Sequence, residues 1–274
     1  MRDFFLNCRM ISKKIILSTH QVNVAFVESI AVRSVKKTVS QENTMLFFLH
    51  EALGSIPQWR SFPQLLCDAL GMHGCVIERR GHGESDELAY ERTARYLHQA
   101  AYEELHELIQ LLLPAGKKAV LIGHSDGGTI ALLYAAKFPK QIAGVVTMAA
   151  HVVNEEVTRR GIHPAIEAYK AGKLDGLKKY HGTQTETLFY AWANTWLSEA
   201  FKAWNIVSDI QGIQAPTLVI QGDEDQYGTE EQLKLIQQAV PTAQLEMMVG
   251  VKHHPHLEQT DDVVEMIRGF LVER

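Results

Sequence analysis

The chain contains 274 residues, of which 46% are hydrophobic, and it carries a formal net charge of −5. This length and apolar content suit one large α/β domain with an inserted segment. A mildly acidic chain gives no reason to expect binding to nucleic acid or to an anionic membrane surface. No apolar stretch approaches the roughly 20 residues of a membrane span.

Cysteine usage points to a reducing compartment. Cys8, Cys67 and Cys75 are an odd, sparse set without the spacing of a metal site. We therefore expect a cytoplasmic protein. Neither a cofactor nor a metal ion is expected, and the sequence specifies no oligomeric state.

Strand and helix signals alternate along the chain. Residues 1–20 are expected to form an N-terminal extension. Strands are expected over residues 22–27, 30–35, 45–49, 75–78, 119–122, 143–148, 217–220 and 245–249. This alternation predicts an α/β fold with a mostly parallel eight-stranded sheet and helices on both faces.

Three helices can be placed around these strands. The first ends before Pro114 and has an apolar face at helical spacing, made of Leu97, Ala101, Leu105, Leu108 and Leu112. The second begins at Thr229, where Gln232 completes a capping-box pattern. The third spans residues 261–271, with its acids first, as the helix dipole prefers.

Residues 151–208 break the alternation because they carry helical patterns without a convincing strand. They are expected to form a helical cap inserted in a body made of residues 21–150 and 209–274. Within them one helical stripe is expected, made of Phe189, Trp192, Trp196, Ala200 and Trp204. Packing of the cap on the body is the favoured interpretation. Alternatively, Trp192 and Trp196 line a substrate pocket and favour an apolar substrate.

Residues 120–128 read VLIGHSDGG and place the pattern GxSxG between an apolar strand and a helix-forming stretch. This is the context of a nucleophile elbow, in which Gly123 and Gly127 relieve crowding around a strained serine, Ser125. The helix that follows points its free N–H groups and positive dipole end at the reacting centre. The sequence therefore predicts a catalytic serine.

Candidate partners for this serine follow two later strands. They are Asp223 and Asp225 after residues 217–220, and His253, His254 and His256 after residues 245–249. The order of serine, acid and histidine is that of an α/β-hydrolase triad. Three imidazoles within four residues also suggest zinc, but Pro255 prevents a regular helix there, so no metal site is expected.

These motifs, together with residues 46–55 and 79–85, make the chain resemble enzymes of the α/β-hydrolase fold from about residue 22 to its C-terminus. The resemblance implies Ser125 as the nucleophile, Asp225 as the acid and His253 as the base. Asp223 stays open as an acid, with a turn or capping role otherwise, and the two other histidines stay open as bases. His82 is expected to be structural.

The resemblance also implies an oxyanion hole built from the backbone N–H groups of Ala52 and Asp126. In the implied chemistry, neutral His253 takes the proton of Ser125 as the serine attacks a carbonyl carbon. Asp225 holds the ring in the correct tautomer and stabilises the imidazolium.

Two acids lie beside the implied oxyanion hole. Glu51 stands where the wider fold has glycine, and its carboxylate is expected to bond the neighbouring turn or face solvent. Alternatively, it adds negative charge near the substrate, which makes it a binding candidate. Asp126 suits the first turn of a helix because of the dipole. Alternatively, it attracts the ammonium group of an amino-acid ester, since hydrolases of such esters resemble this SDGG sequence.

The function predicted from the sequence is a cofactor-independent carboxylesterase that acts on a small or medium ester. Hydrolysis of a carbon–carbon bond in a β-diketone-like compound and hydrolysis of an amino-acid ester are the enzymatic alternatives. A non-catalytic binding protein that retains the fold is the alternative outside enzymes.

Overall fold

The computed structural model describes residues 10–30, 43–89 and 91–272. In this part of the chain, eight strands form one sheet in the order β1-β2-β4-β3-β5-β6-β7-β8. Their bounds are β1 (Met10–Ile16), β2 (Gln21–Val27), β3 (Thr44–Leu49), β4 (Gly74–Glu78), β5 (Lys118–His124), β6 (Ile142–Met148), β7 (Thr217–Gly222) and β8 (Gln244–Met248). Strands β3 to β8 are parallel, and β2 is antiparallel to both of its neighbours. The predicted mostly parallel eight-stranded sheet is confirmed.

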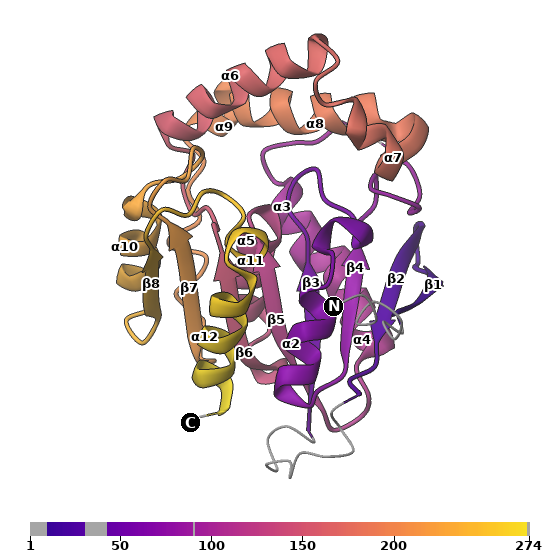
Figure 1. Cartoon of the computed structure of the whole chain (residues 1–274), viewed down its shortest axis with the longest axis vertical. Helices are drawn as coiled ribbons and strands as arrows, with labels where there is room; N and C mark the ends of the chain where they lie inside the picture. Colours follow the sequence, from indigo (N-terminus) through magenta and orange to yellow (C-terminus); the bar gives the residue numbers. More distant parts are fainter. Residues whose placement is uncertain (1–9, 31–42, 90, 273–274) are drawn as a thin grey trace, which may run out of the picture.

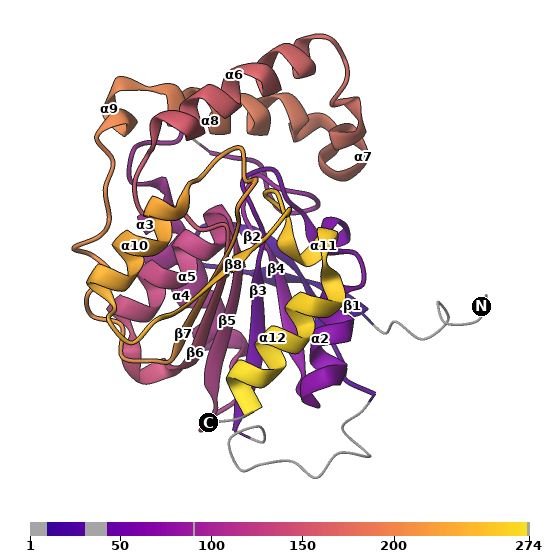
Figure 2. The same ribbon diagram turned by 60° about the vertical axis from the view of Figure 1, so that its left-hand side comes forward.

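Helices cover both faces of this sheet. They are α2 (Phe62–Leu70), α3 (Tyr96–Gln99), α4 (Leu105–Leu112), α5 (Asp126–Lys137), α6 (Glu156–Lys170), α7 (Lys178–His181), α8 (Thr185–Leu197), α9 (Glu199–Lys202), α10 (Glu230–Ala239), α11 (Pro255–Glu258) and α12 (Thr260–Val272). Helices α2 and α12 pack on each other on one face, whereas α4, α5 and α10 lie on the other (Figure 2). Helices α6 to α9 form a helical layer above the carboxyl ends of the parallel strands (Figure 1).

The core is divided by the sheet into two apolar clusters. Neighbouring residues of a strand point to opposite faces, so Phe47 and Leu49 join the cluster under α4 and α5 while Phe48 joins the cluster under α2 and α12. Both phenylalanines are fully buried. Burial of each such side chain stabilises the fold by about 1.5–3 kcal/mol.

The N-terminal part of the sheet differs from the prediction. Residues 10–16 were expected within an extension over residues 1–20, but they form the edge strand β1, paired antiparallel with β2. Most of β1 is exposed, and Lys13 and Lys14 are in its middle, as suits an edge strand. Exposure on both faces removes the alternating pattern by which a strand is recognised. The strand expected over 30–35 falls almost entirely on residues outside the described ranges.

The helix predicted around Leu105 is present but not regular. It comprises α3, a π-helical stretch over Ala100–Glu104, and α4. Leu97, Ala101 and Leu105 are all buried. Side chains spaced four residues apart rotate progressively around an α-helix, because it has 3.6 residues per turn. The π-helical turn is wider, so it keeps Leu97, Ala101 and Leu105 on one face.

The helical layer corrects the prediction of a single aromatic stripe. The aromatic stripe is not on one helix, because α8 ends at Leu197 and Ser198 caps α9 by accepting the N–H of Phe201. Ala200 is therefore exposed, and Phe201 is buried in its place, stacked on Trp204. The two stems of the layer meet in a bridge between Val153 and Asn205.

The capping box at α10 also differs. The Thr229 hydroxyl accepts the N–H of Glu231, but the side chain of Gln232 does not return to Thr229. Gln232 is fully buried and bonds the N–H of Val152, at the stem of the helical layer. Glu155 instead accepts the Thr229 N–H at 3.0 Å.

In the described part of the chain, no helix combines the length and apolar character needed to cross a bilayer.

Candidate active site

Ser125 occupies a strained turn between β5 and α5. Its φ of 51° and ψ of −117° are unusual for a residue with a side chain. The flanking glycines make room for this turn. A Cβ on Gly127 would lie 1.9 Å from the carbonyl oxygen of Leu49, and one on Gly123 would lie 2.3 Å from that of Gly127. The turn leaves Ser125 7% exposed at the carboxyl end of the sheet.

The predicted acid and histidine are brought together at the ends of neighbouring strands. Asp225 follows β7, His253 follows β8, and the ring Nδ1 lies 2.9 Å from both carboxylate oxygens. Asp225 also accepts the side-chain amide of Gln221 at 2.6 Å and the N–H of Tyr227 at 2.8 Å. Burial opposes ionisation of Asp225, but His253 and these donors hold its pKa below the usual value. The carboxylate thus fixes the Nδ1–H tautomer and leaves Nε2 as an acceptor.

Ser125 and His253 line the same cavity, with a volume of about 120 Å³. Among the described residues, no hydrogen bond joins the Ser125 hydroxyl to the His253 ring. Proton transfer from Ser125 to His253 would therefore require the hydroxyl group and the ring to come within hydrogen-bond distance. Catalytic hydrogen bonds commonly tighten in this way when substrate binds. A larger cavity of about 450 Å³ borders Arg79 and Glu104, and Ser125 is not among its lining residues.

The alternative acid and histidines have other partners. Asp223 accepts the N–H of Gly250 at 2.7 Å, as a turn carboxylate does. His256 is buried against Trp59 and Phe62. His254 packs on the ring of His124, and burial lowers its pKa to about 4. Only the ring of His253 is bonded to Asp225 among the histidines of the described ranges.

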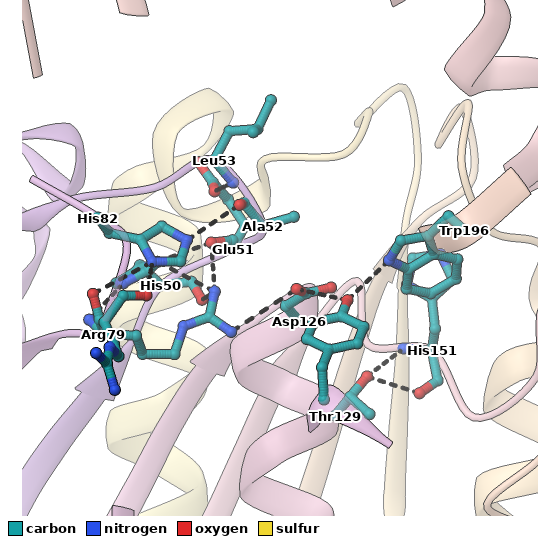
Figure 3. Close-up of polar contacts among 12 residues, drawn as sticks. His50, Glu51, Ala52, Leu53, Arg79, His82, Asp126, Thr129, His151 and Trp196 are labelled. Atoms are coloured by element: carbon teal, nitrogen blue, oxygen red, sulfur yellow. Dashed lines mark hydrogen bonds and ion pairs between the residues drawn. The ribbon is translucent and has the colours of Figure 1, made fainter. Parts of the chain in front are cut away.

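The carbonyl groups of Glu51, Ala52 and Leu53 each lie within hydrogen-bond distance of a buried side chain, and Figure 3 draws the first two of these contacts. Arg79 donates from Nη2 to the carbonyl oxygen of Glu51 at 2.8 Å. The Nε2 atom of His82 lies 3.1 Å from the carbonyl oxygen of Ala52. His181, from the end of α7, donates from Nε2 to Leu53 at 2.9 Å. The predicted oxyanion donor, the N–H of Ala52, therefore belongs to a loop whose carbonyl groups face buried side chains.

Glu51 folds back onto this loop. Its carboxylate accepts the N–H of Leu53 at 2.7 Å, so the predicted bond to the neighbouring turn is present. The residue also lines the cavity that contains Ser125. Burial raises the pKa of Glu51 to about 7, although the Leu53 N–H and the Arg79 charge oppose this increase.

Asp126 lines the cavity, and its carboxylate has polar partners within the protein (Figure 3). It accepts the hydroxyl of Tyr96 at 2.8 Å, and that hydroxyl in turn accepts the indole N–H of Trp196 at 2.8 Å. Arg79 Nη1 lies 3.7 Å from the same carboxylate oxygen, and both side chains are buried. Arg79 therefore supplies a nearby compensating charge. The binding of an ammonium group by Asp126 stays a prediction.

Comparison with known proteins places this geometry in a family. The model of the alpha/beta hydrolase family matches residues 46–266. The chain belongs to the alpha/beta hydrolase family. It is 26% identical to Lipase 1 of Psychrobacter immobilis over an alignment that covers 89% of this chain and 83% of that protein. It is 28% identical to Lipase 3 of Moraxella sp. (strain TA144) over 271 residues, covering 89% and 84% respectively.

Solved structures share the fold at lower identity. Proline iminopeptidase from Mycobacterium smegmatis superposes with a TM-score of 0.71 at 15% identity, covering 96% of this hydrolase and 98% of that chain. The enol-lactonase from Burkholderia xenovorans superposes with a TM-score of 0.69 at 17% identity, covering 94% and 99%. At these identities the likeness extends to the fold alone.

The remaining walls of the cavity in this alpha/beta hydrolase are mostly aromatic, beside Leu53 and Thr158. Trp192 and Trp196, both predicted as binding candidates, line it from α8. Sequence reasoning missed His151 and Tyr227, which also line it. The Tyr227 ring lies 4.8 Å from that of His253, and the Nε2 of His151 lies 3.0 Å from the Tyr227 carbonyl oxygen. The position of Tyr227, two residues after the candidate acid, was the available signal.

Proposed function

We propose that this alpha/beta hydrolase cleaves carboxylic esters through an acyl-enzyme formed on Ser125. The hydrogen-bonded pair of Asp225 and His253 carries this proposal, because the carboxylate orients the His253 ring and both His253 and Ser125 line the same cavity. The strained turn at Ser125 adds support, since such strain clusters at active sites.

In the proposed mechanism, Nε2 of His253 removes the hydroxyl proton of Ser125 while its oxygen attacks the ester carbonyl carbon. The N–H groups of Ala52 and Asp126 stabilise the resulting oxyanion. The imidazolium then gives its proton to the departing alcohol, which leaves an ester on Ser125. Water, deprotonated by the same imidazole, attacks that ester and releases the acid and the free serine.

We further infer that residues 151–208 act as a cap on a body made of residues 21–150 and 209–274. The helical layer lies over the carboxyl ends of the strands (Figure 1). Its helix α8 contributes Trp192 and Trp196 to the cavity. Aromatic walls favour an apolar acyl or alcohol group. The free, buried thiols of Cys67 and Cys75 support a reducing, cytoplasmic environment.

Labelling with a fluorophosphonate, combined with a panel of p-nitrophenyl esters, tests the proposal. The wild type is expected to be labelled at Ser125 and to hydrolyse short esters, whereas Ser125→Ala should lose both properties. Ser61→Ala is the matched control, because Ser61 is exposed and makes no capping bond. A folded wild type that is neither labelled nor active would favour a binding protein. Cleavage of a vinylogous diketone without ester hydrolysis would favour the carbon–carbon alternative.

A further inference from the structure

Arg79 lies between the two segments that carry the proposed oxyanion donors. It directly follows β4 and is 5% exposed. Its Nη2 donates to the carbonyl oxygens of Glu51 and His50, at 2.8 and 3.2 Å. Its Nη1 lies 3.7 Å from the Asp126 carboxylate. One guanidinium therefore spans the loop over residues 50–54 and the first turn of α5 (Figure 3).

The bond to Glu51 fixes the direction of one proposed donor. The carbonyl of Glu51 and the N–H of Ala52 belong to the same planar peptide and point in opposite directions. Holding the carbonyl against Arg79 thus holds the Ala52 N–H on the other side. The backbone N–H of Arg79 adds a further tie, because it donates to Nε2 of His50 at 3.1 Å.

The ion pair with Asp126, at 3.7 Å, holds the second segment near the same guanidinium. The Asp126 side chain is 1% exposed and accepts the Tyr96 hydroxyl, which Trp196 orients from α8. A buried carboxylate needs a compensating charge and donors, and Arg79 and Tyr96 supply them. The residue that carries the second proposed N–H is therefore anchored to the same guanidinium as the first.

We propose that Arg79 is a positioning residue that sets the separation and orientation of the two oxyanion donors, with Asp126 as its counter-ion. This inference rests on the proposed ester hydrolysis. Arg79 does not touch the reacting atoms; it acts through the peptide of Glu51 and Ala52 and through the side chain of Asp126. The planar guanidinium reaches both partners at once, whereas an ammonium group is a single point of contact.

Substitution of Arg79 by lysine separates positioning from charge compensation. In Arg79→Lys the buried Asp126 keeps a cation, so thermal unfolding is expected near that of the wild type. The kcat for p-nitrophenyl acetate should fall about tenfold or more, with KM changed less than about threefold, because the donors act mainly in the transition state. Affinity for a trifluoromethyl ketone, whose adduct places an oxyanion in the hole, should fall by a similar factor.

Two further variants keep the test decisive. Arg79→Met leaves the buried Asp126 carboxylate without its cation and is expected to destabilise the fold. The double variant Arg79→Met/Asp126→Asn therefore removes both charges together. The double variant should fold and show the same kcat loss. Arg80→Met is the matched control, because the neighbouring guanidinium donates to the carbonyl of Glu87 and does not touch the loop.

The inference is overturned if Arg79→Lys and the folded double variant both keep kcat within about threefold of Arg80→Met, which would leave a purely structural ion pair. A change confined to KM would also overturn it. A wild type that is neither labelled at Ser125 nor active overturns the proposed hydrolysis, and this inference with it. If the wild type is active and the Arg79 variants are unaffected, this inference is overturned but the proposed hydrolysis is not.

Discussion

The two sides of the candidate site are assembled differently. On the acid and histidine side, Asp225 is held by Gln221 and Tyr227, within four residues of itself, and by His253 from the adjacent strand end. On the oxyanion side, the partners of Glu51 and Leu53 lie 28 and 128 residues away in the chain. A short motif can record the bonds of Gln221 and Tyr227, and His253, 28 residues further on, follows the next strand at family spacing. The oxyanion side depends on side chains that only the folded chain brings together.

The largest effect is expected on the acid and histidine side, from Asp225→Asn. An amide facing Nδ1 of His253 favours the wrong tautomer, so kcat should fall roughly 10³- to 10⁴-fold while KM changes little. Steady-state hydrolysis of p-nitrophenyl acetate measures this loss. Asp223→Asn is the matched control and should stay within about twofold, because its carboxylate bonds the Gly250 turn. Equal losses in the two variants would contradict the assignment of Asp225.

The same contrast explains what the sequence could and could not predict. Strands β3 to β8 are short apolar runs bounded by turn residues, and a nucleophile, acid and histidine at their ends follow family spacing. Strand β1 was missed because both of its faces are largely exposed. The prediction for the helical layer was too simple, because a new helix, α9, begins after Ser198 within an unbroken aromatic pattern. Nothing in the local sequence of Arg79 indicates that it contacts Glu51 and Asp126.

On the oxyanion side, substitutions of His181 should have smaller effects, and they can distinguish its two hydrogen bonds. This ring is 2% exposed, accepts the N–H of Gly83 at Nδ1 and donates from Nε2 to Leu53, both at 2.9 Å. Glutamine can replace the donor to Leu53, and asparagine can replace the acceptor for Gly83. Each loses one hydrogen bond, so unfolding free energy should fall by about 1 kcal/mol in both.

Activity should distinguish these two variants of His181. Only His181→Asn releases the Leu53 carbonyl, so its kcat should fall about three- to tenfold, while His181→Gln should stay within about twofold. Gln184→Met provides the control, since Gln184 ties the same segment to the Ser85 carbonyl without touching the loop. If all three variants lose kcat equally, general attachment of the helical layer matters, and the bond to Leu53 has no special role.

An effect of similar size is expected from the charge of Glu51, and it depends on pH. Because burial raises its pKa to about 7, the Glu51 carboxyl is neutral below that pH and ionised above it. An anion beside the proposed oxyanion opposes its formation, so kcat should decline about three- to tenfold as pH rises through about 7. In Glu51→Gln this decline should disappear from the pH profile, whereas Glu84→Gln, which removes an exposed carboxylate, should retain it.

Stability should follow the same titration of Glu51, with a sign that can be stated. The folded chain retains a proton between the ordinary pKa of 4.5 and about 7, whereas the unfolded chain releases it. The contribution of Glu51 to the free energy of unfolding should therefore decrease as pH rises across that interval and stay constant above it. Chemical unfolding of the wild type and Glu51→Gln at several pH values measures the difference. Parallel stability curves would show that Glu51 ionises normally, and the activity decline would then belong to another group.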